Sequence, residues 1–347
     1  MSERMIGGPW FEDFTVGDDM SDVPAVTVTE GYAALHQAIF GDRLRLPLDR
    51  ELCTRVTGES RLLVNPALVC NLAIGQSTVP SQRVMGNLFY RGLRLHRPVF
   101  IDDTLTTRTR IVALRQNKIR PGRAASGMVA LEVDVRNQQG ETVMLFWRCP
   151  MVPCREPSAD TGHNDDFSMM SEDISDLDLA ESAPDWNLDG FADFGGLHFA
   201  DLAAGDRFII ESRDTVTSAP ELVRMTLNMA MTHTDAGSSV YGRRLVYGGH
   251  TIATAAAQLS RALPNLVSVL AWRKCDHVAP VFENDILAAR VTVSGTTPVA
   301  TGGGLVDLNV TVDADRGHSE PGQGSETTPE ESEDVQVLDW HLVALVG

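Results

Sequence analysis

The sequence predicts an α+β protein built from two similar halves, and two observations predict this class. Residues 10–18 are similar to residues 198–206, and residues 90–105 are similar to residues 272–287, which lie 182 positions later. Self-similarity at a nearly constant spacing indicates an internal duplication. Within each half, helical periodicity comes first and strand alternation follows, which favours helices packed with an antiparallel sheet.

Each half presents the same order of elements: a short strand, a helix, a polar loop, a second helix and four alternating strands. In the first half we expect them at residues 25–29, 30–40, 66–76, 84–91, 104–115, 127–137 and 142–152. In the second half we expect them at residues 214–217, 220–231, 249–263, 267–273, 286–294, 304–313 and 335–345. Two such halves could pair edge to edge and leave no bare sheet edge between them.

The charge distribution suggests the domain boundaries. The formal net charge is −18, but 11 acidic residues fall within 156–189 and 6 within 320–334, with no Lys or Arg in either stretch. Such composition favours solvated segments. We therefore expect an N-terminal half at 1–155, an acidic linker at 156–193 and a C-terminal half at 194–347 with an acidic insertion at 315–334. Both acidic segments are expected to be dispensable for folding.

Composition also argues against several classes of protein. Outside the acidic segments the chain is close to neutral, so no nucleic-acid partner is expected. The five cysteines are odd in number and lie mostly in apolar stretches, which favours reduced core thiols over disulfides or a metal site. No apolar run reaches 18 residues and the N-terminus lacks an apolar signal region, so we expect no membrane partner and a cytoplasmic location.

Residues 227–257 carry the candidate site. His233 lies in a polar stretch, and Gly248 and Gly249 open a run of small apolar residues. Glycines let backbone approach a ligand closely, and free N–H groups at a helix start attract developing negative charge. Chemistry next to a thioester carbonyl requires at least a base and such an oxyanion site. The alternative is that His233 is a satisfied loop residue and the glycines form a tight turn.

The spacing of these residues resembles that of the MaoC-like double hotdog hydratases. The family's catalytic segment has an Asp, an Asn-Pro, a His with an Asp two residues later, and a second His 17 residues after the first. His233 and Asp235 match the His element, and His250 lies 17 residues after His233. The resemblance implies a tandem hotdog fold, in which two antiparallel sheets each wrap around a central helix. It also implies a hydro-lyase acting on a short or branched enoyl-CoA or 3-hydroxyacyl-CoA.

The sequence also departs from that pattern. Asn228 stands where most of the family has the catalytic Asp, and the Asn-Pro is absent. An Asn here is similar to the mesaconyl-CoA hydratase (β-methylmalyl-CoA dehydratase) branch, which the first half also resembles at residues 63–66 and 98–100. In the first half Pro47 falls where the His would be. Only the second half therefore keeps a candidate base.

The residue chemistry gives provisional roles in catalysis. His233 can act as a base because imidazole titrates near neutrality. Asn228 can orient a water or bind a carbonyl, but it transfers no proton near pH 7. The missing carboxylate could come from Asp235 or, across the two halves, from Asp42. Tyr247 is a candidate for the acyl pocket, together with Gly248, Gly249 and His250, although an aromatic residue beside a helix is more often core.

A basic loop is the candidate partner of the coenzyme A phosphates. Lys118, Arg120 and Arg123 fall within residues 115–123, and phosphate would favour such a cluster. The alternative is an ordinary solvated hairpin. We expect acyl-CoA as the partner, no cofactor besides the coenzyme A of the substrate, no metal, and a possible homodimer. Two rival functions remain: an acyl-CoA binding module that has lost its acid, and a hotdog thioesterase.

Overall fold

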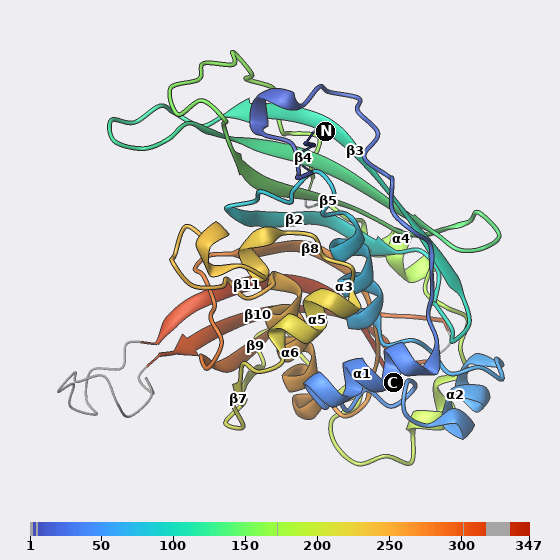
Figure 1. The fold of residues 1–347 in the computed structure, drawn as a ribbon. Coiled ribbons are helices and arrows are strands. Elements are labelled where there is room, and N and C mark those ends of the chain that lie inside the picture. The colour runs from blue at the N-terminus through green and yellow to red at the C-terminus, as the bar shows by residue number, and fades with distance from the viewer. Residues whose placement is uncertain (1–2, 5, 172, 301, 317–333) are drawn as a thin grey trace.

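The computed structural model describes residues 3–4, 6–171, 173–300, 302–316 and 334–347. An eleven-stranded antiparallel sheet runs through the molecule, with helices packed against it (Figure 1). The strands are β1 (Val26–Thr27), β2 (Gly86–Leu95), β3 (Thr104–Gln116), β4 (Ser126–Arg136), β5 (Thr142–Pro153), β6 (Arg207–Ile209), β7 (Asp214–Thr215), β8 (Leu266–His277), β9 (Ile286–Pro298), β10 (Gly304–Asp315) and β11 (Val335–Val346). The helices are α1 (Glu30–Phe40), α2 (Arg50–Thr57), α3 (Pro66–Gln76), α4 (Asp176–Glu181), α5 (Ala219–Met225) and α6 (Gly248–Ala262). None of these helices is long and apolar enough to cross a bilayer, among the residues that the structure describes.

The strand order confirms the predicted duplication. It runs β1-β3-β4-β5-β2 and then β8-β11-β10-β9-β6, with β7 also on β9, so the halves join edge to edge through β2 and β8. Tyr90 of β2 pairs with Cys275 of β8. Their counterparts 182 positions away, Trp272 and Leu93, also pair with each other. This reciprocal register is what a two-fold relation between the halves produces.

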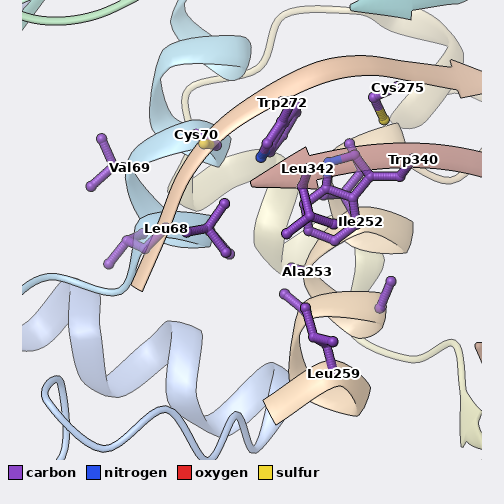
Figure 2. Packing of buried hydrophobic residues seen from close by; sticks show 14 of the residues in the cluster. Leu68, Val69, Cys70, Ile252, Ala253, Leu259, Trp272, Cys275, Trp340 and Leu342 are labelled. Atoms are coloured by element: carbon purple, nitrogen blue, oxygen red, sulfur yellow. The ribbon is translucent and has the colours of Figure 1, made fainter. Parts of the chain in front are cut away.

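The core lies where α3 and α6 pack beneath the sheet. All eleven residues of α3 are buried, and so are twelve residues of α6. A helix that is apolar or small on every side is expected to be enclosed in this way. Figure 2 shows Leu68 of α3 and Ile252 of α6 in the same cluster as Trp272 and Trp340 of the sheet. Each such large side chain contributes about 1.5–3 kcal/mol by leaving water.

The helix expected over residues 220–231 ends early. α5 stops at Met225, and Leu227 has a left-handed φ of 55°. This conformation is costly for a branched side chain and is common at functional sites. The chain after it is tied to the first half, because the Met229 N–H donates to Thr78 Oγ1 at 2.8 Å. The early end therefore brings the next segment, which carries the candidate base, against the other half.

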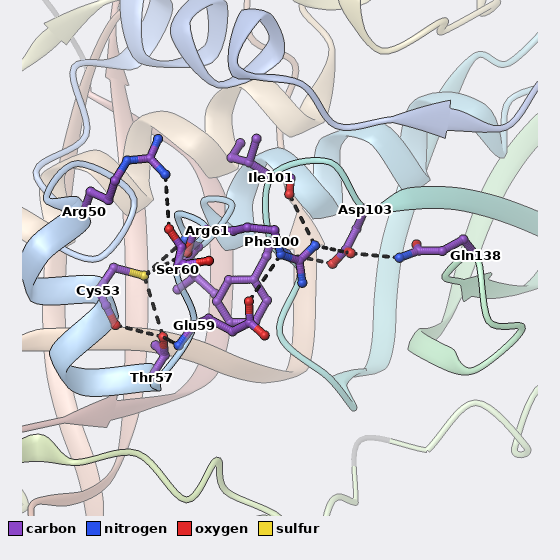
Figure 3. A network of polar contacts seen from close by, with 11 residues as sticks. Arg50, Cys53, Thr57, Glu59, Ser60, Arg61, Phe100, Ile101, Asp103 and Gln138 are labelled. Atoms are coloured by element: carbon purple, nitrogen blue, oxygen red, sulfur yellow. Dashed lines mark hydrogen bonds and ion pairs between the residues drawn. The ribbon is translucent and has the colours of Figure 1, made fainter.

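One helix lies within the stretch interpreted from sequence as a polar loop. α2 is capped by Asp49, whose side chain accepts from the Leu52 N–H at 2.9 Å. Only three of its eight residues are buried apolar side chains, and so short a run among polar residues was interpreted as part of the loop. Figure 3 shows the polar network beside it, in which Arg61 donates to Asp103 at 2.8 Å.

The acidic linker is only partly solvated, whereas the sequence analysis expected all of it to be. Leu179, Trp186, Leu188 and Phe191 are buried in a core cluster that includes side chains of both halves. The acidic residues between them face solvent. The acidic composition of the linker therefore gave no sign that its apolar side chains pack against the two halves. The acidic insertion predicted at 315–334 lies outside the described residues except at its two ends.

Candidate active site

A cavity of about 270 Å³ lies at the junction of the two halves. Its wall comes from the start of β2, the end of β8, the segment after α5 and the start of α6. The polar side chains that matter for chemistry are Tyr90, Arg148, Asn228, His233, Tyr247 and His277. No Asp or Glu lines it in the part of the chain that the structure describes. The expected base is therefore in a pocket, but the expected carboxylate is not beside it.

His233 is held in one orientation. It ends a 3-10 turn, and its Nδ1–H donates to the carbonyl of Leu245 at 2.8 Å. Because a carbonyl only accepts, Nδ1 carries the proton and Nε2 keeps its lone pair. Burial lowers the pKa of His233 to about 4. At neutral pH the ring is therefore uncharged and able to accept a proton.

Asn228 presents a donor to the same cavity. Its Oδ1 accepts from the Ala230 N–H at 2.9 Å, which fixes the orientation of the amide. Its Nδ2 is buried and has no hydrogen-bond partner among the described residues. A buried donor without a partner is costly, and a ligand oxygen or a water would satisfy it. Asn228 is thus placed to bind an oxygen atom.

The start of α6 forms one wall of the cavity. Gly248 and Gly249 occupy the first two helical positions, where the helix itself offers no acceptor for their N–H groups. A Cβ on Gly248 would lie 2.5 Å from Nε2 of His277, so glycine lets that ring pack against the helix start. The Tyr247 hydroxyl donates to the Asn71 carbonyl of α3 at 2.9 Å, which ties this helix start to the other half.

Two polar residues of the cavity were not found from the sequence. His277 is the last residue of β8, its Nε2 has no partner among the described residues, and burial lowers its pKa to about 4. Arg148 lies on β5 and is 2% exposed. The one sequence signal was an arginine at an inward position of an otherwise apolar strand. Neither residue belongs to the motif through which the site was sought.

Two curated relatives span most of the chain. The β-methylmalyl-CoA dehydratase of Chloroflexus aurantiacus is 29% identical over 316 residues, covering 86% of this chain and 87% of the relative. The mesaconyl-CoA hydratase of Cereibacter sphaeroides is 30% identical over 287 residues, covering 81% and 82%. The chain belongs to the mesaconyl-CoA hydratase branch of the MaoC-like double hotdog family. No model of a protein family matches it.

Solved structures of this family share the whole architecture. A conserved hypothetical protein of Mycobacterium tuberculosis, described as having a double hotdog fold, has a TM-score of 0.87 and 43% identity, with 99% of each chain covered. A putative MaoC domain protein dehydratase of Chloroflexus aurantiacus has a TM-score of 0.81 and 25% identity, again with 99% of each chain covered. The α+β tandem hotdog predicted from the sequence is confirmed.

The two carboxylates suggested from the family pattern lie elsewhere. Asp235 is exposed, caps its own turn by accepting from the Gly237 N–H at 2.9 Å, and does not line the cavity. Asp42 is buried, but it accepts from Asn65 Nδ2 at 2.8 Å and Ser260 Oγ at 2.6 Å. It links the two halves structurally. The expectation that either one supplies the missing acid is therefore corrected.

The second family histidine and the basic loop are also outside the cavity wall. His250 donates through Nε2 to the Thr217 carbonyl at 2.7 Å and packs against Phe40, so it anchors α6 and does not meet substrate there. The basic loop between β3 and β4 is exposed and contributes no lining residue. Its role in binding phosphate through Lys118, Arg120 and Arg123 stays a prediction.

The first half contains the matching pocket, but it is much smaller. A cavity of about 40 Å³ is lined by Pro66, Val69 and Leu95, which are the counterparts, 182 positions earlier, of Gly248, Thr251 and His277. These three counterparts are apolar, and proline has no N–H at the helix start. Leu179, Pro184 and Trp186 of the acidic linker line it as well. The family fold therefore keeps one chemically equipped pocket here.

Proposed function

We propose that this protein is a hydro-lyase of CoA thioesters. It adds water across the double bond of a short or branched enoyl-CoA, or removes water from the corresponding 3-hydroxyacyl-CoA. The observation that carries the proposal is the uncharged imidazole of His233, fixed by Leu245 in a cavity that also includes the start of α6. The curated relatives are named for the same reaction on mesaconyl-CoA and β-methylmalyl-CoA.

The proposed reaction uses one base twice. Nε2 of His233 removes a proton from water as the oxygen adds to the β-carbon. The negative charge moves to the thioester oxygen, where the N–H groups of Gly248 and Gly249 stabilise it. The imidazolium then gives its proton to the α-carbon, which restores the neutral ring. Asn228 Nδ2 orients the water or the thioester oxygen. This sequence needs no carboxylate in the cavity, in agreement with its lining.

Coenzyme A enters this scheme as part of the substrate. The proposed steps use protein groups and water, so no further cofactor is needed. The rival functions start from the same fold but give different products: a thioesterase would release free CoA, and a binding module would bind the thioester without turnover.

The test is turnover of His233→Ala beside the parent protein on a panel of enoyl-CoAs. We expect the loss of the base to lower kcat by about 10²–10⁴-fold. Because the pKa of His233 is about 4 and the neutral ring is the active form, kcat/KM of the parent should stay level as pH falls from 8 to about 5.

Thr234→Ala is the matched control, because Thr234 is the exposed neighbour of His233. It should retain the parent's activity and melting temperature. Full activity in His233→Ala would exclude the proposed mechanism, and release of free CoA by the parent would identify a thioesterase. Binding of thioesters by a parent that turns over none of them would identify a binding module.

A further inference from the structure

Arg148 is a buried cation in the wall of the proposed active-site cavity. It lies on β5, it is 2% exposed, and its neighbour across the sheet is Tyr90 of β2. Nothing in the proposed hydration step uses it. A guanidinium stays charged at all ordinary pH values, and removing such an ion from water is expensive unless an anion compensates it.

The described residues give Arg148 only neutral partners. Its Nη1 donates to Ser77 Oγ at 2.9 Å and to the Ile74 carbonyl at 3.2 Å, and its Nη2 donates to Ser81 Oγ at 2.7 Å. Its Nε is buried with no acceptor. A guanidinium has five N–H groups, so three are used and the rest remain available. In the described ranges no acidic side chain forms an ion pair with it.

The aromatic hydroxyls beside Arg148 do not neutralise it either. Burial raises the pKa of both Tyr90 and Tyr247 well above the ordinary range, so each stays a neutral phenol. The three serine and carbonyl contacts orient the guanidinium without supplying charge. The cavity therefore holds one fixed positive charge and no negative one among its described lining residues.

The duplication shows that the fold itself does not need this charge. Tyr90 pairs with Arg148 in the first half, and Trp272, the counterpart of Tyr90, pairs with Leu342 in the second. Leu342 is therefore the counterpart of Arg148, and it is 1% exposed. Figure 2 shows it in the apolar cluster with Trp272 and Trp340. The fold therefore accommodates leucine at this position in the second half, where the side chain packs in the apolar core.

We propose that Arg148 is the receptor for a carboxylate carried on the acyl group of the substrate. This inference rests on the proposed function and assigns to Arg148 the distinction between acyl groups that end in a carboxylate and acyl groups that do not. A fixed full charge matches an anion present in the ground state, and the planar fork of arginine matches the two oxygens of a carboxylate. The coenzyme A phosphates lie a long pantetheine arm away from the thioester, whereas Arg148 shares its cavity with His233.

The thioester oxygen is a less suitable partner for this charge. It is neutral until the transition state, and the start of α6 already offers N–H groups to it. A cation placed for the acyl carboxylate would instead discriminate between substrates in the binding step. Arg148 is thus a specificity residue that contacts the end of the acyl group.

The test compares acyl groups that differ only in the carboxylate. Binding of succinyl-CoA and of butyryl-CoA, both saturated and unreactive towards hydration, is measured for the parent, Arg148→Leu and Arg148→Lys. We expect the parent to prefer succinyl-CoA and Arg148→Leu to lose on the order of 100-fold in affinity for it, with little change for butyryl-CoA. Arg148→Lys keeps the charge without the fork and should retain part of the preference.

A second readout separates recognition from a structural role. Since Leu342 occupies the equivalent position, Arg148→Leu should melt at or above the parent when no ligand is bound. An equal loss of affinity for both thioesters, or an unchanged preference in Arg148→Leu, would overturn the inference. If Arg148→Leu does not fold, two results together would overturn the inference. The parent would bind both thioesters with equal affinity, and Arg148→Lys would show the same lack of preference. If the parent prefers succinyl-CoA but hydrates neither mesaconyl-CoA nor crotonyl-CoA, the inference stands and the proposed function fails.

Discussion

At the scale of residues, the cavity combines buried ionisable groups, with no carboxylate among the described residues that line it. His233 and His277 are both neutral at pH 7 because burial lowers the pKa of each to about 4. Of the lining residues that the structure describes, Arg148 alone carries a charge, since burial keeps the tyrosines protonated. A neutral base can take a proton from water, and an isolated cation can bind an anion. The two tasks, chemistry and recognition, are thus assigned to different side chains.

Asn228 offers the sharpest single-residue comparison within the family pattern. Asn228→Asp replaces the unpartnered Nδ2 donor with an oxygen, while the second oxygen can still accept from the Ala230 N–H. If a substrate oxygen binds at Nδ2, the Asp variant meets it with repulsion. We expect a loss of about 10-fold or more in kcat/KM on the preferred substrate, in line with loss of a buried hydrogen bond.

The measurement is kcat/KM of the parent and Asn228→Asp on the same panel of enoyl-CoAs. Straight-chain enoyl-CoAs are the informative substrates, since the Asp restores the carboxylate that the family pattern described above leads one to expect at this position. Equal or higher activity of Asn228→Asp on every substrate would show that the amide donor contacts no substrate oxygen. An inert parent with an active Asp variant would favour the binding-module alternative.

At the scale of elements, the acidic linker has a structural role that its composition conceals. Its side chains Leu179, Pro184 and Trp186 line the pocket of the first half, which is the counterpart of the active-site cavity. Trp186 is 6% exposed within the core cluster of that region. The linker therefore closes the pocket that lacks catalytic groups, and it cannot be removed without exposing apolar surface.

Trp186→Ala should lower the free energy of unfolding by about 3–5 kcal/mol, because it leaves a large cavity between the linker and both halves. Its neighbour Asp185 is exposed, so Asp185→Asn is the matched control and should stay within about 0.5 kcal/mol of the parent. Urea unfolding of the three proteins measures both effects. If Trp186→Ala is as stable as the parent, the linker does not contribute to the core and is solvated, as its charge suggests.

At the scale of the whole molecule, the buried histidines make the fold sensitive to acid. His36, His233 and His277 each have a pKa of about 4 in the folded chain, against 6.5 for the free side chain. Below pH 6.5 the unfolded chain takes up protons that the folded chain refuses until about pH 4. The free energy of unfolding should therefore fall between those pH values, by at most about 3 kcal/mol per histidine.

Urea unfolding at pH 7.5, 6.5, 5.5 and 4.5 measures this dependence. His277→Leu introduces the residue that the first half has at the equivalent position, Leu95, and should reduce the pH slope, because it removes one of the buried histidines whose pKa is lowered. A flat stability between pH 6.5 and 4.5, or an unchanged slope in His277→Leu, would mean that these rings take up protons in the folded chain. Above about pH 7.5 these histidines contribute almost no pH dependence, because the unfolded chain is then also largely deprotonated.

The sequence alone determined the duplication, the fold class and the position of His233 before a glycine-led helix, because periodicity, repeats and motif spacing are local properties of the chain. Only the tertiary structure decided which polar groups meet. Arg148 and His277 reach His233 from strands far away in sequence, joined by the pairing of β2 with β5 and β8. In the sequence, His250 matches the family motif and Asp42 is a candidate for the missing carboxylate. Their hydrogen bonds show instead that both residues hold α6 in place. Sequence spacing fixes what lies on one element, whereas the register between strands of two halves fixes which side chains share a cavity.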